Sequence, residues 1–67
     1  MKFAVIGLGS FGTKRAQSIK NSKLAELVAI HDTNKGNLEK ASQLLDVQAS
    51  EYNQILNDKN IDVVCIC

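Results

Sequence analysis

The sequence predicts an α/β fold with a doubly wound parallel sheet, and three observations support this prediction. Short aliphatic runs alternate with segments of helical periodicity along the 67 residues. The aliphatic runs are nearly continuous, which is typical of strands buried on both faces. A glycine-rich stretch, "GLGSFG", overlaps the end of the first run. Such alternation produces βαβ units with right-handed crossovers and helices on both faces of the sheet.

The first half of the chain predicts two strands with a helix between them. Lys2 to Leu8 is the first apolar run. A helix is expected from about Phe11, because Thr13 to Lys23 contains neither Gly nor Pro and places its apolar residues on one side. The second strand is expected over Leu24 to Ile30, "LAELVAI", and ends at the polar "HDTN".

The second half predicts two more helices and two more strands. Lys35 to Asp46 has apolar residues at helical spacing, and Asn34 is a candidate N-cap. Val47 to Ala49 is expected to form a very short strand. Ser50 is a candidate N-cap for a helix through about Asp58. The final "NIDVVCIC" is expected to form a strand. The inward side chains of the last helix are expected to be Tyr52, Ile55 and Leu56.

The composition excludes several classes of function. The formal net charge is +1, and no basic run predicts binding to nucleic acid or to a membrane surface. No apolar run reaches the roughly 18 residues that span a bilayer. The first residues lead directly into a strand and lack the pattern of a signal peptide. We therefore expect a cytoplasmic protein that binds neither nucleic acid nor membranes.

The chain offers few residues for metal binding or acid–base catalysis. Its two cysteines, Cys65 and Cys67, are expected to be reduced and to serve as small buried hydrophobic residues. A zinc site needs four ligands, and His31 is the only histidine. His31 directly follows the second predicted strand, where we expect no reacting group. We therefore predict no metal site and no catalytic residue within this chain.

Gly7, Gly9 and Gly12 match the pattern G-x-G-x-x-G between a strand and a helix. The first glycine permits a tight turn, the second allows a pyrophosphate to approach the backbone, and the third allows close packing of the helix. The N-terminus of the following helix would present free amides and its positive dipole end to the phosphates. The alternative is a purely structural turn between strand and helix.

Asp32 lies 20 positions after Gly12, at the end of the second strand. A carboxylate at this position accepts hydrogen bonds from the ribose of the adenosine in dinucleotide-binding sites. It would also repel the 2′-phosphate of NADP, so the sequence favours NAD over NADP. The alternative is that Asp32 only caps the following turn.

The predicted final strand has an open apolar edge, which complete proteins normally protect. We therefore expect residues 1–67 to be the N-terminal portion of a dinucleotide-binding domain in a longer polypeptide that also contains a substrate domain. The same edge is expected to promote self-association through strand pairing.

These features together resemble the N-terminal part of the Gfo/Idh/MocA family of NAD(P)-dependent oxidoreductases. The matching stretches are, in order, "FAVIGLGSFGTKRA", "AELVAIHD", "LEKASQLL", "SEYNQILND" and "IDVVCIC". The resemblance covers all 67 residues but only about half of that family's nucleotide domain. It implies a parent enzyme that transfers a hydride between a nicotinamide and a sugar or cyclitol.

The resemblance also implies roles for individual residues. The three glycines would form the phosphate loop, with Ser10 and Phe11 supplying backbone N–H groups. Asp32 would hold the adenosine ribose, and Thr33 would lie beside it. The family's Thr-Pro-Asn turn and its catalytic lysine would follow later in the chain, so this chain alone is expected to be inactive and to bind NAD weakly.

A second family fits the opening stretch as well. The nucleotide-binding regulatory domains of potassium channels and transporters would also accommodate "FAVIGLGSFG". In these domains, nucleotide binding gates transport. The later stretch "SEYNQILNDKNIDVVCIC" resembles the oxidoreductase pattern better, so we prefer the oxidoreductase interpretation.

Overall fold

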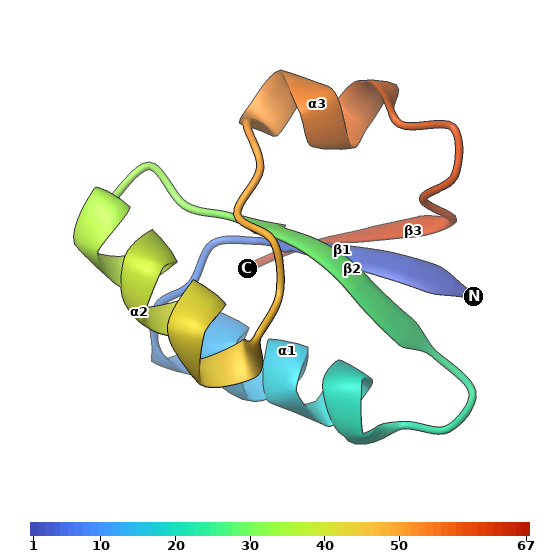
Figure 1. Ribbon diagram of the computed structural model, residues 1–67, viewed down its shortest axis with the longest axis horizontal. Coiled ribbons are helices and arrows are strands. Elements are labelled where there is room, and N and C mark those ends of the chain that lie inside the picture. Colours follow the sequence, from blue (N-terminus) through green and yellow to red (C-terminus); the bar gives the residue numbers. More distant parts are fainter.

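The computed structural model describes residues 1–67 and has six elements around one sheet (Figure 1). In chain order they are β1 (Lys2–Ile6), α1 (Ser10–Asn21), β2 (Glu26–His31), α2 (Lys35–Leu45), α3 (Tyr52–Asn57) and β3 (Val63–Ile66). The three strands are parallel and lie in the order β2-β1-β3. The predicted α/β fold with a doubly wound parallel sheet is therefore confirmed.

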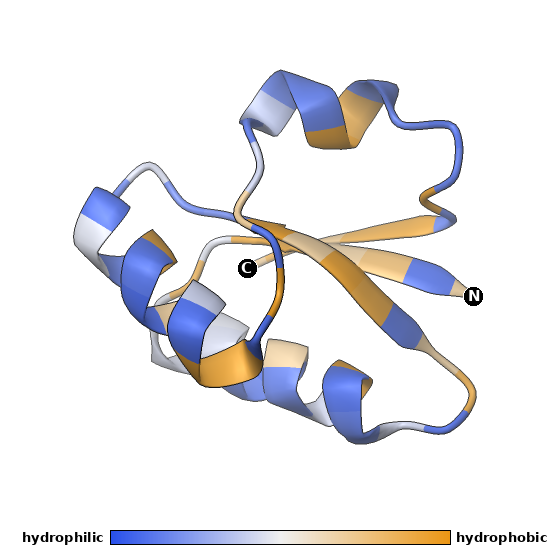
Figure 2. Cartoon of the chain, viewed as in Figure 1, coloured by the Kyte–Doolittle hydropathy of each residue, from blue (hydrophilic) through white to orange (hydrophobic).

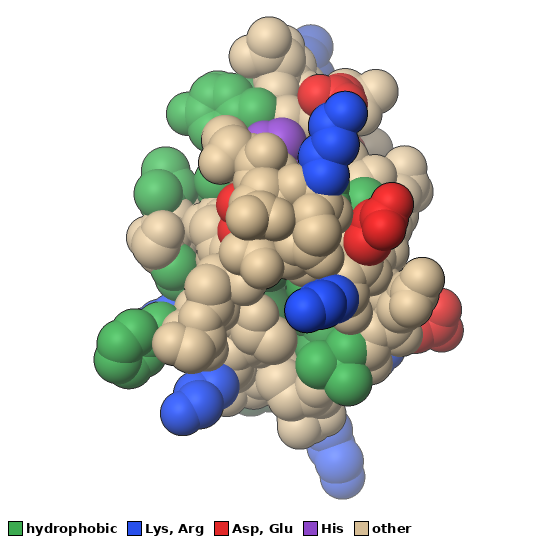
Figure 3. Space-filling view, turned by 90° about the vertical axis from the view of Figure 1, so that its left-hand side faces the viewer, with side chains coloured by type: hydrophobic (Ala, Val, Ile, Leu, Met, Phe, Trp, Pro, Cys, Tyr) green, Lys and Arg blue, Asp and Glu red, His purple; other side chains and the backbone are tan.

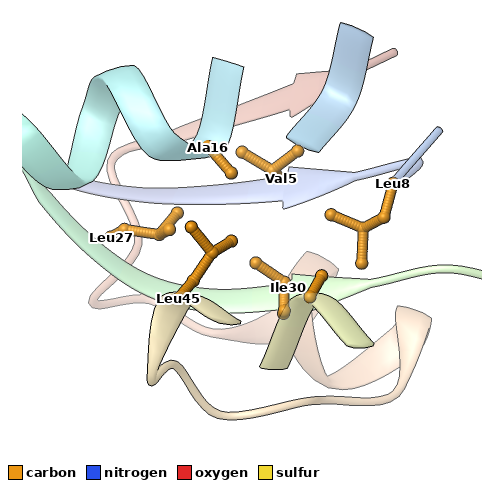
Figure 4. Close-up of a cluster of buried hydrophobic side chains, with 7 residues drawn as sticks. Val5, Leu8, Ala16, Leu27, Ile30 and Leu45 are labelled. Carbon is orange, nitrogen blue, oxygen red and sulfur yellow. The ribbon is translucent and has the colours of Figure 1, made fainter. Parts of the chain in front are cut away.

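Helices cover both faces of the sheet, with α1 and α2 on one face and α3 on the other (Figure 1). Figure 2 shows mainly hydrophobic strands between helices with hydrophilic outer surfaces. The larger core lies under α1 and α2, and Figure 4 shows its side chains meeting between the sheet and these helices. Its members are Val5, Leu8, Ala16, Leu27, Ile30, Ala41 and Leu45. These contacts hold α1 against β1 and β2, and α2 against β2.

The smaller core lies under α3 and contains Ala4, Ala29 and Ile55. Ile55 is 2% exposed and is the only buried residue of α3. Tyr52 and Leu56, which the sequence placed in the core, are 44% and 49% exposed, so this prediction is wrong. The helix has only six residues and rests on the sheet mainly through one side chain.

The strand β2 carries an irregularity that decides which side chains reach each face. Phe3 pairs with Leu27, but the next residue of β1 pairs with Ala29, so Val28 is an extra residue in the ladder. As a result, Leu27 and Ile30 both belong to the larger core, while Val28 and Ala29 both face the smaller one.

Several boundaries differ from the sequence predictions, and the N-cap of α3 is Glu51 rather than Ser50. The strand β2 begins at Glu26 rather than Leu24, which is 87% exposed in the preceding loop. The very short strand expected over Val47 to Ala49 is reduced to a single bridge between Ile30 and Ala49. The helix α1 begins at Ser10, one residue earlier than expected.

The two cysteines are free thiols, as expected, but only one of them packs against the core. Cys65 is half-buried against the larger core, whereas Cys67 is exposed. The expectation of a buried side chain is therefore wrong for Cys67, which lies just past the end of β3. None of the helices combines the length and the apolar character that crossing a membrane requires.

Candidate functional site

The predicted site residues all lie at one edge of the sheet, where the carboxyl ends of the parallel strands meet. This edge is on the left in Figure 1 and faces the viewer in Figure 3. The loop between β1 and α1 contains the glycines, and the loop between β2 and α2 contains Asp32 and Thr33. Ligands of open α/β sheets bind outside this edge.

Gly7 opens the loop in a conformation that favours glycine. Its φ is +97°, and a Cβ here would collide with the backbone oxygen of Cys67. The amide of Gly7 donates to the carbonyl of His31 at 2.9 Å, and the amide of Cys67 donates to the carbonyl of Ile6 at 2.9 Å. The first turn of the loop is therefore fixed between both neighbouring strands.

Gly12 allows α1 to lie directly on this turn. A Cβ at Gly12 would collide with the carbonyl oxygen of Gly7. The side chain of Thr13 adds a hydrogen bond from its Oγ1 to the carbonyl of Leu8, at 3.1 Å. The third glycine of the motif therefore permits close contact between the helix and the loop itself.

Gly9 is different, because nothing in the chain requires a glycine there. Its φ of −68° suits any residue, and a Cβ would have no atom within 4 Å. The first amide of α1 with a backbone acceptor is that of Thr13, which donates to the carbonyl of Gly9 at 2.9 Å. The amides of Ser10, Phe11 and Gly12 are the free donors of the helix N-terminus. Open space, free donors and the positive dipole end suit an anion.

Asp32 is held by two backbone amides. Its Oδ2 accepts from the amide of Leu8 at 2.7 Å, and its Oδ1 accepts from the amide of Asn34 at 2.9 Å. Both hydrogen bonds hold the pKa of the Asp32 carboxyl below its ordinary value of 3.8, and the bond from Asn34 has the larger effect. Partial burial acts in the opposite direction. The side chain is therefore a fixed carboxylate at neutral pH, on the same side of the sheet as the glycine loop.

A hollow of about 450 Å³ lies beside Asp32 on the α3 side of this edge. Its lining residues are Ile6, Gly7, His31, Asp32, Thr33 and Tyr52. In Figure 3 the single histidine of the chain is visible at this edge. Sequence reasoning assigned Tyr52 to the core and so missed this hollow. One signal in the sequence could have revealed it. Tyr52 comes soon after the short strand predicted over Val47 to Ala49, so the helix that it begins starts at the carboxyl edge of the sheet.

Comparison with known proteins identifies relatives of the whole chain. The sequence profile of an oxidoreductase family, described as its NAD-binding Rossmann fold, matches residues 1–67. A myo-inositol 2-dehydrogenase from Thermotoga maritima is 33% identical over 69 aligned positions, which cover 100% of this chain and 21% of the relative. The chain therefore spans about one fifth of the length of this relative.

Solved structures show the same arrangement. The myo-inositol dehydrogenase from Lactobacillus casei, in complex with NAD(H) and myo-inositol, is 30% identical with a TM-score of 0.87, covering 100% of this chain and 21% of that chain. Biliverdin reductase from Synechocystis sp. PCC 6803, in complex with biliverdin and NADP+, is 22% identical with a TM-score of 0.92, covering 98% and 21%. The second likeness concerns the fold alone.

Proposed function

The chain belongs to the Gfo/Idh/MocA oxidoreductase family, with its NAD-binding Rossmann fold, and from this premise we propose that residues 1–67 bind the diphosphate and adenosine of NAD. The open backbone at Gly9, next to three free amides, is the observation that carries the proposal. We further propose that these residues are the N-terminal portion of a nucleotide domain. The family profile favours this function over a channel regulatory domain.

The diphosphate would be held without any charged side chain. Ser10 and Phe11 would donate their backbone amides, with the positive dipole end of α1 behind them. Gly9 would allow the phosphates to approach, because no Cβ fills the space there. Gly7 and Gly12 would act indirectly, by fixing the turn and the position of the helix.

The ribose would be held by Asp32, with Thr33 beside it. Both carboxylate oxygens already accept one backbone hydrogen bond, and each retains a lone pair for a ribose hydroxyl. Because the two amides fix the carboxylate, it cannot turn away from a 2′-phosphate without losing these bonds. The negative charge therefore favours NAD over NADP.

For the parent protein we propose hydride transfer between the nicotinamide and a carbon of a sugar or cyclitol. The similarity to two enzymes named as myo-inositol dehydrogenases supports a polyhydroxylated substrate. When bound, NAD supplies the hydride acceptor, and this chain contributes binding and orientation. A catalytic lysine would have to come from outside residues 1–67. We therefore propose that the chain alone is inactive.

Calorimetric titration of the 67-residue chain with NAD tests this function. We expect weak but measurable binding, because the other walls of the cofactor crevice are absent. The Gly9→Val variant should keep the fold, because Gly9 has an ordinary φ and open space around it. The side chain of the new valine should block the approach of the phosphates and lower the affinity for NAD by about tenfold or more.

A matched control is Gln43→Val, which places the same side chain on the exposed side of α2. It should bind NAD as the unmodified chain does. Equal affinity of the unmodified chain and Gly9→Val would contradict the proposed phosphate site. Submicromolar affinity of the isolated chain would contradict the idea that residues outside it complete the crevice.

We also infer that the free edge of β3 promotes self-association. β3 pairs with β1 on one side only, and its other edge has no partner strand. Ile66 at the end of this strand is 71% exposed, and Phe11, which lines the same surface groove, is 84% exposed. An open strand edge with apolar residues favours pairing with another chain.

A further inference from the structure

We propose that His31 selects adenine as the base of the dinucleotide, by accepting a hydrogen bond from its exocyclic amine, and that Tyr52 packs against the same base. This inference rests on the proposed function. It adds a specificity-determining residue outside the glycine loop and outside the ribose contact.

The position of the hollow supports a base-binding role. The base of a nucleotide is attached directly to the ribose, and the ribose is assigned here to Asp32. The hollow begins at Asp32 and continues along His31 and Tyr52, on the α3 side of the sheet edge. Its volume of about 450 Å³ falls within the range of small-molecule sites.

The hydrogen bond of His31 fixes which ring nitrogen carries the proton. Its Nδ1 lies 2.8 Å from the carbonyl oxygen of Ser50. A carbonyl oxygen can only accept, so Nδ1 must carry the hydrogen and donate it. In the neutral ring, Nε2 is then left with a lone pair and acts as an acceptor. Nε2 has no hydrogen-bond partner within the chain, although the ring lines the hollow.

Tyr52 supplies an aromatic surface for the same base. Its ring centroid is 6.1 Å from that of His31, and the two ring planes are inclined by 56°. The chain has only three Phe, Trp and Tyr residues in total, yet Tyr52 is 44% exposed rather than buried in the core. Two rings inclined to each other beside a hollow can contact a third flat ring by stacking on one and meeting the edge of the other.

The acceptor at Nε2 predicts discrimination between two bases. Adenine carries an amine, a donor, at the ring position where hypoxanthine carries a carbonyl, an acceptor. With the hypoxanthine base, two acceptors would face each other and the hydrogen bond would be lost. Sites built to bond a donor reject analogues that lack it. For a site open to solvent we expect a preference of about tenfold for NAD over nicotinamide hypoxanthine dinucleotide.

The chain allows this to be measured without any enzyme assay. Tyr52 is its only tyrosine and it has no tryptophan, so tyrosine fluorescence reports on the hollow alone. His31 is its only histidine, so its imidazole ¹⁵N signals are unambiguous. The 67-residue chain is titrated with NAD and with nicotinamide hypoxanthine dinucleotide at mildly alkaline pH. NAD should quench the fluorescence and shift the Nε2 signal, while the analogue should bind about tenfold more weakly.

Two variants test the assignment. His31→Phe keeps a flat ring but removes the acceptor, so it should bind both dinucleotides with similar affinity. Gln43→Ala on α2 should keep the preference. If His31→Phe does not fold, the Nε2 signal of the unmodified chain decides. Equal affinities for the two dinucleotides, an intact preference in His31→Phe, or an Nε2 signal that NAD leaves unchanged would overturn the inference.

Failure of this inference is distinguishable from failure of the proposed function. If NAD binds and Gly9→Val weakens it, but no base preference exists, only the role of His31 is refuted. If NAD does not bind, or if Gly9→Val binds it with the same affinity as the unmodified chain, the dinucleotide site itself is refuted. The assignment of the base site is then refuted as well.

Discussion

The carboxylate of Asp32 accepts a hydrogen bond from the backbone amide of Leu8 at 2.7 Å, which ties the end of β2 to the glycine loop after β1. A second bond from the amide of Asn34 fixes the other carboxylate oxygen. The residue proposed to bind the ribose therefore also shapes the loop proposed to bind the diphosphate. Substitutions at Asp32 should affect both functions together.

The pH dependence of stability should reflect this double contact. The folded pKa of Asp32 lies below its ordinary value of 3.8, because backbone amides donate to the ionised form. The contribution of Asp32 to stability is therefore fully present above its pKa in the unfolded chain. It is lost as the pH falls through the lower pKa of the folded chain. Urea unfolding between about pH 6 and pH 2 should show this loss below roughly pH 4.

The variant Asp32→Asn isolates this effect from that of the other carboxylates. Its neutral amide can accept from one backbone N–H, but its own NH₂ group would face the other. Asp32→Asn should be less stable than the unmodified chain at neutral pH, and the difference should shrink toward pH 2. A difference in the free energy of unfolding that stays constant over this range would contradict the assignment.

Substitution of Gly12 should destabilise the fold, whereas substitution of Gly9 should have little effect on stability. Gly12→Ala places a Cβ against the carbonyl oxygen of Gly7, so α1 has to move. We expect a loss of about 1–3 kcal/mol in the free energy of unfolding, as for other overpacked sites. Gly9→Val should change stability by less than about 1 kcal/mol. Urea titrations of both variants measure this contrast, and equal losses would refute it.

The attachment of α3 should depend on one side chain. Ile55→Ala removes the only buried residue of this helix, and we expect a loss of about 2–5 kcal/mol. Loss of helical circular dichroism with the sheet retained would indicate that α3 detaches. The neighbouring Leu56→Ala is a matched control, because Leu56 is 49% exposed and its truncation should have little effect. Similar losses for both variants would contradict the packing described here.

Self-association should depend on the free edge of β3. Light scattering of the unmodified chain should show species larger than the 7.3 kDa monomer. Ile66→Lys places a charge on this edge and should shift the chain toward monomers. Leu24→Lys changes another exposed aliphatic residue, at the other end of the sheet, and should leave the association unchanged. A strictly monomeric unmodified chain would refute the inference.

The element order and sheet class could be predicted because local patterns determine them. Nearly continuous aliphatic runs predicted all three strands of the sheet, and the glycine motif marked the turn after the first. Strand and helix ends were less predictable. Leu24 is as aliphatic as Leu27 of β2, yet it lies in a loop and is 87% exposed. Hydrophobicity alone does not show where pairing with β1 begins.

The surroundings of the site were predictable only in part. The pattern of glycines and Asp32 placed these residues at one edge because parallel strands end together there. It could not reveal the bond from Leu8, which joins residues 24 positions apart. Helical spacing assigned Tyr52 and Leu56 to the core. With only six residues, α3 buries Ile55 alone and leaves both of these side chains exposed.

The extra residue at Val28 has a consequence for cofactor recognition. In a regularly pleated β2, alternation from Leu27 would direct position 31 to the α1 side and position 32 to the α3 side. The imidazole of His31 would then lie beside the loop proposed to bind the diphosphate, and the Asp32 carboxylate would lose its hydrogen bond from the amide of Leu8. With the extra residue, the same sequence instead places His31 in the hollow on the α3 side and the Asp32 carboxylate within hydrogen-bond distance of the glycine loop.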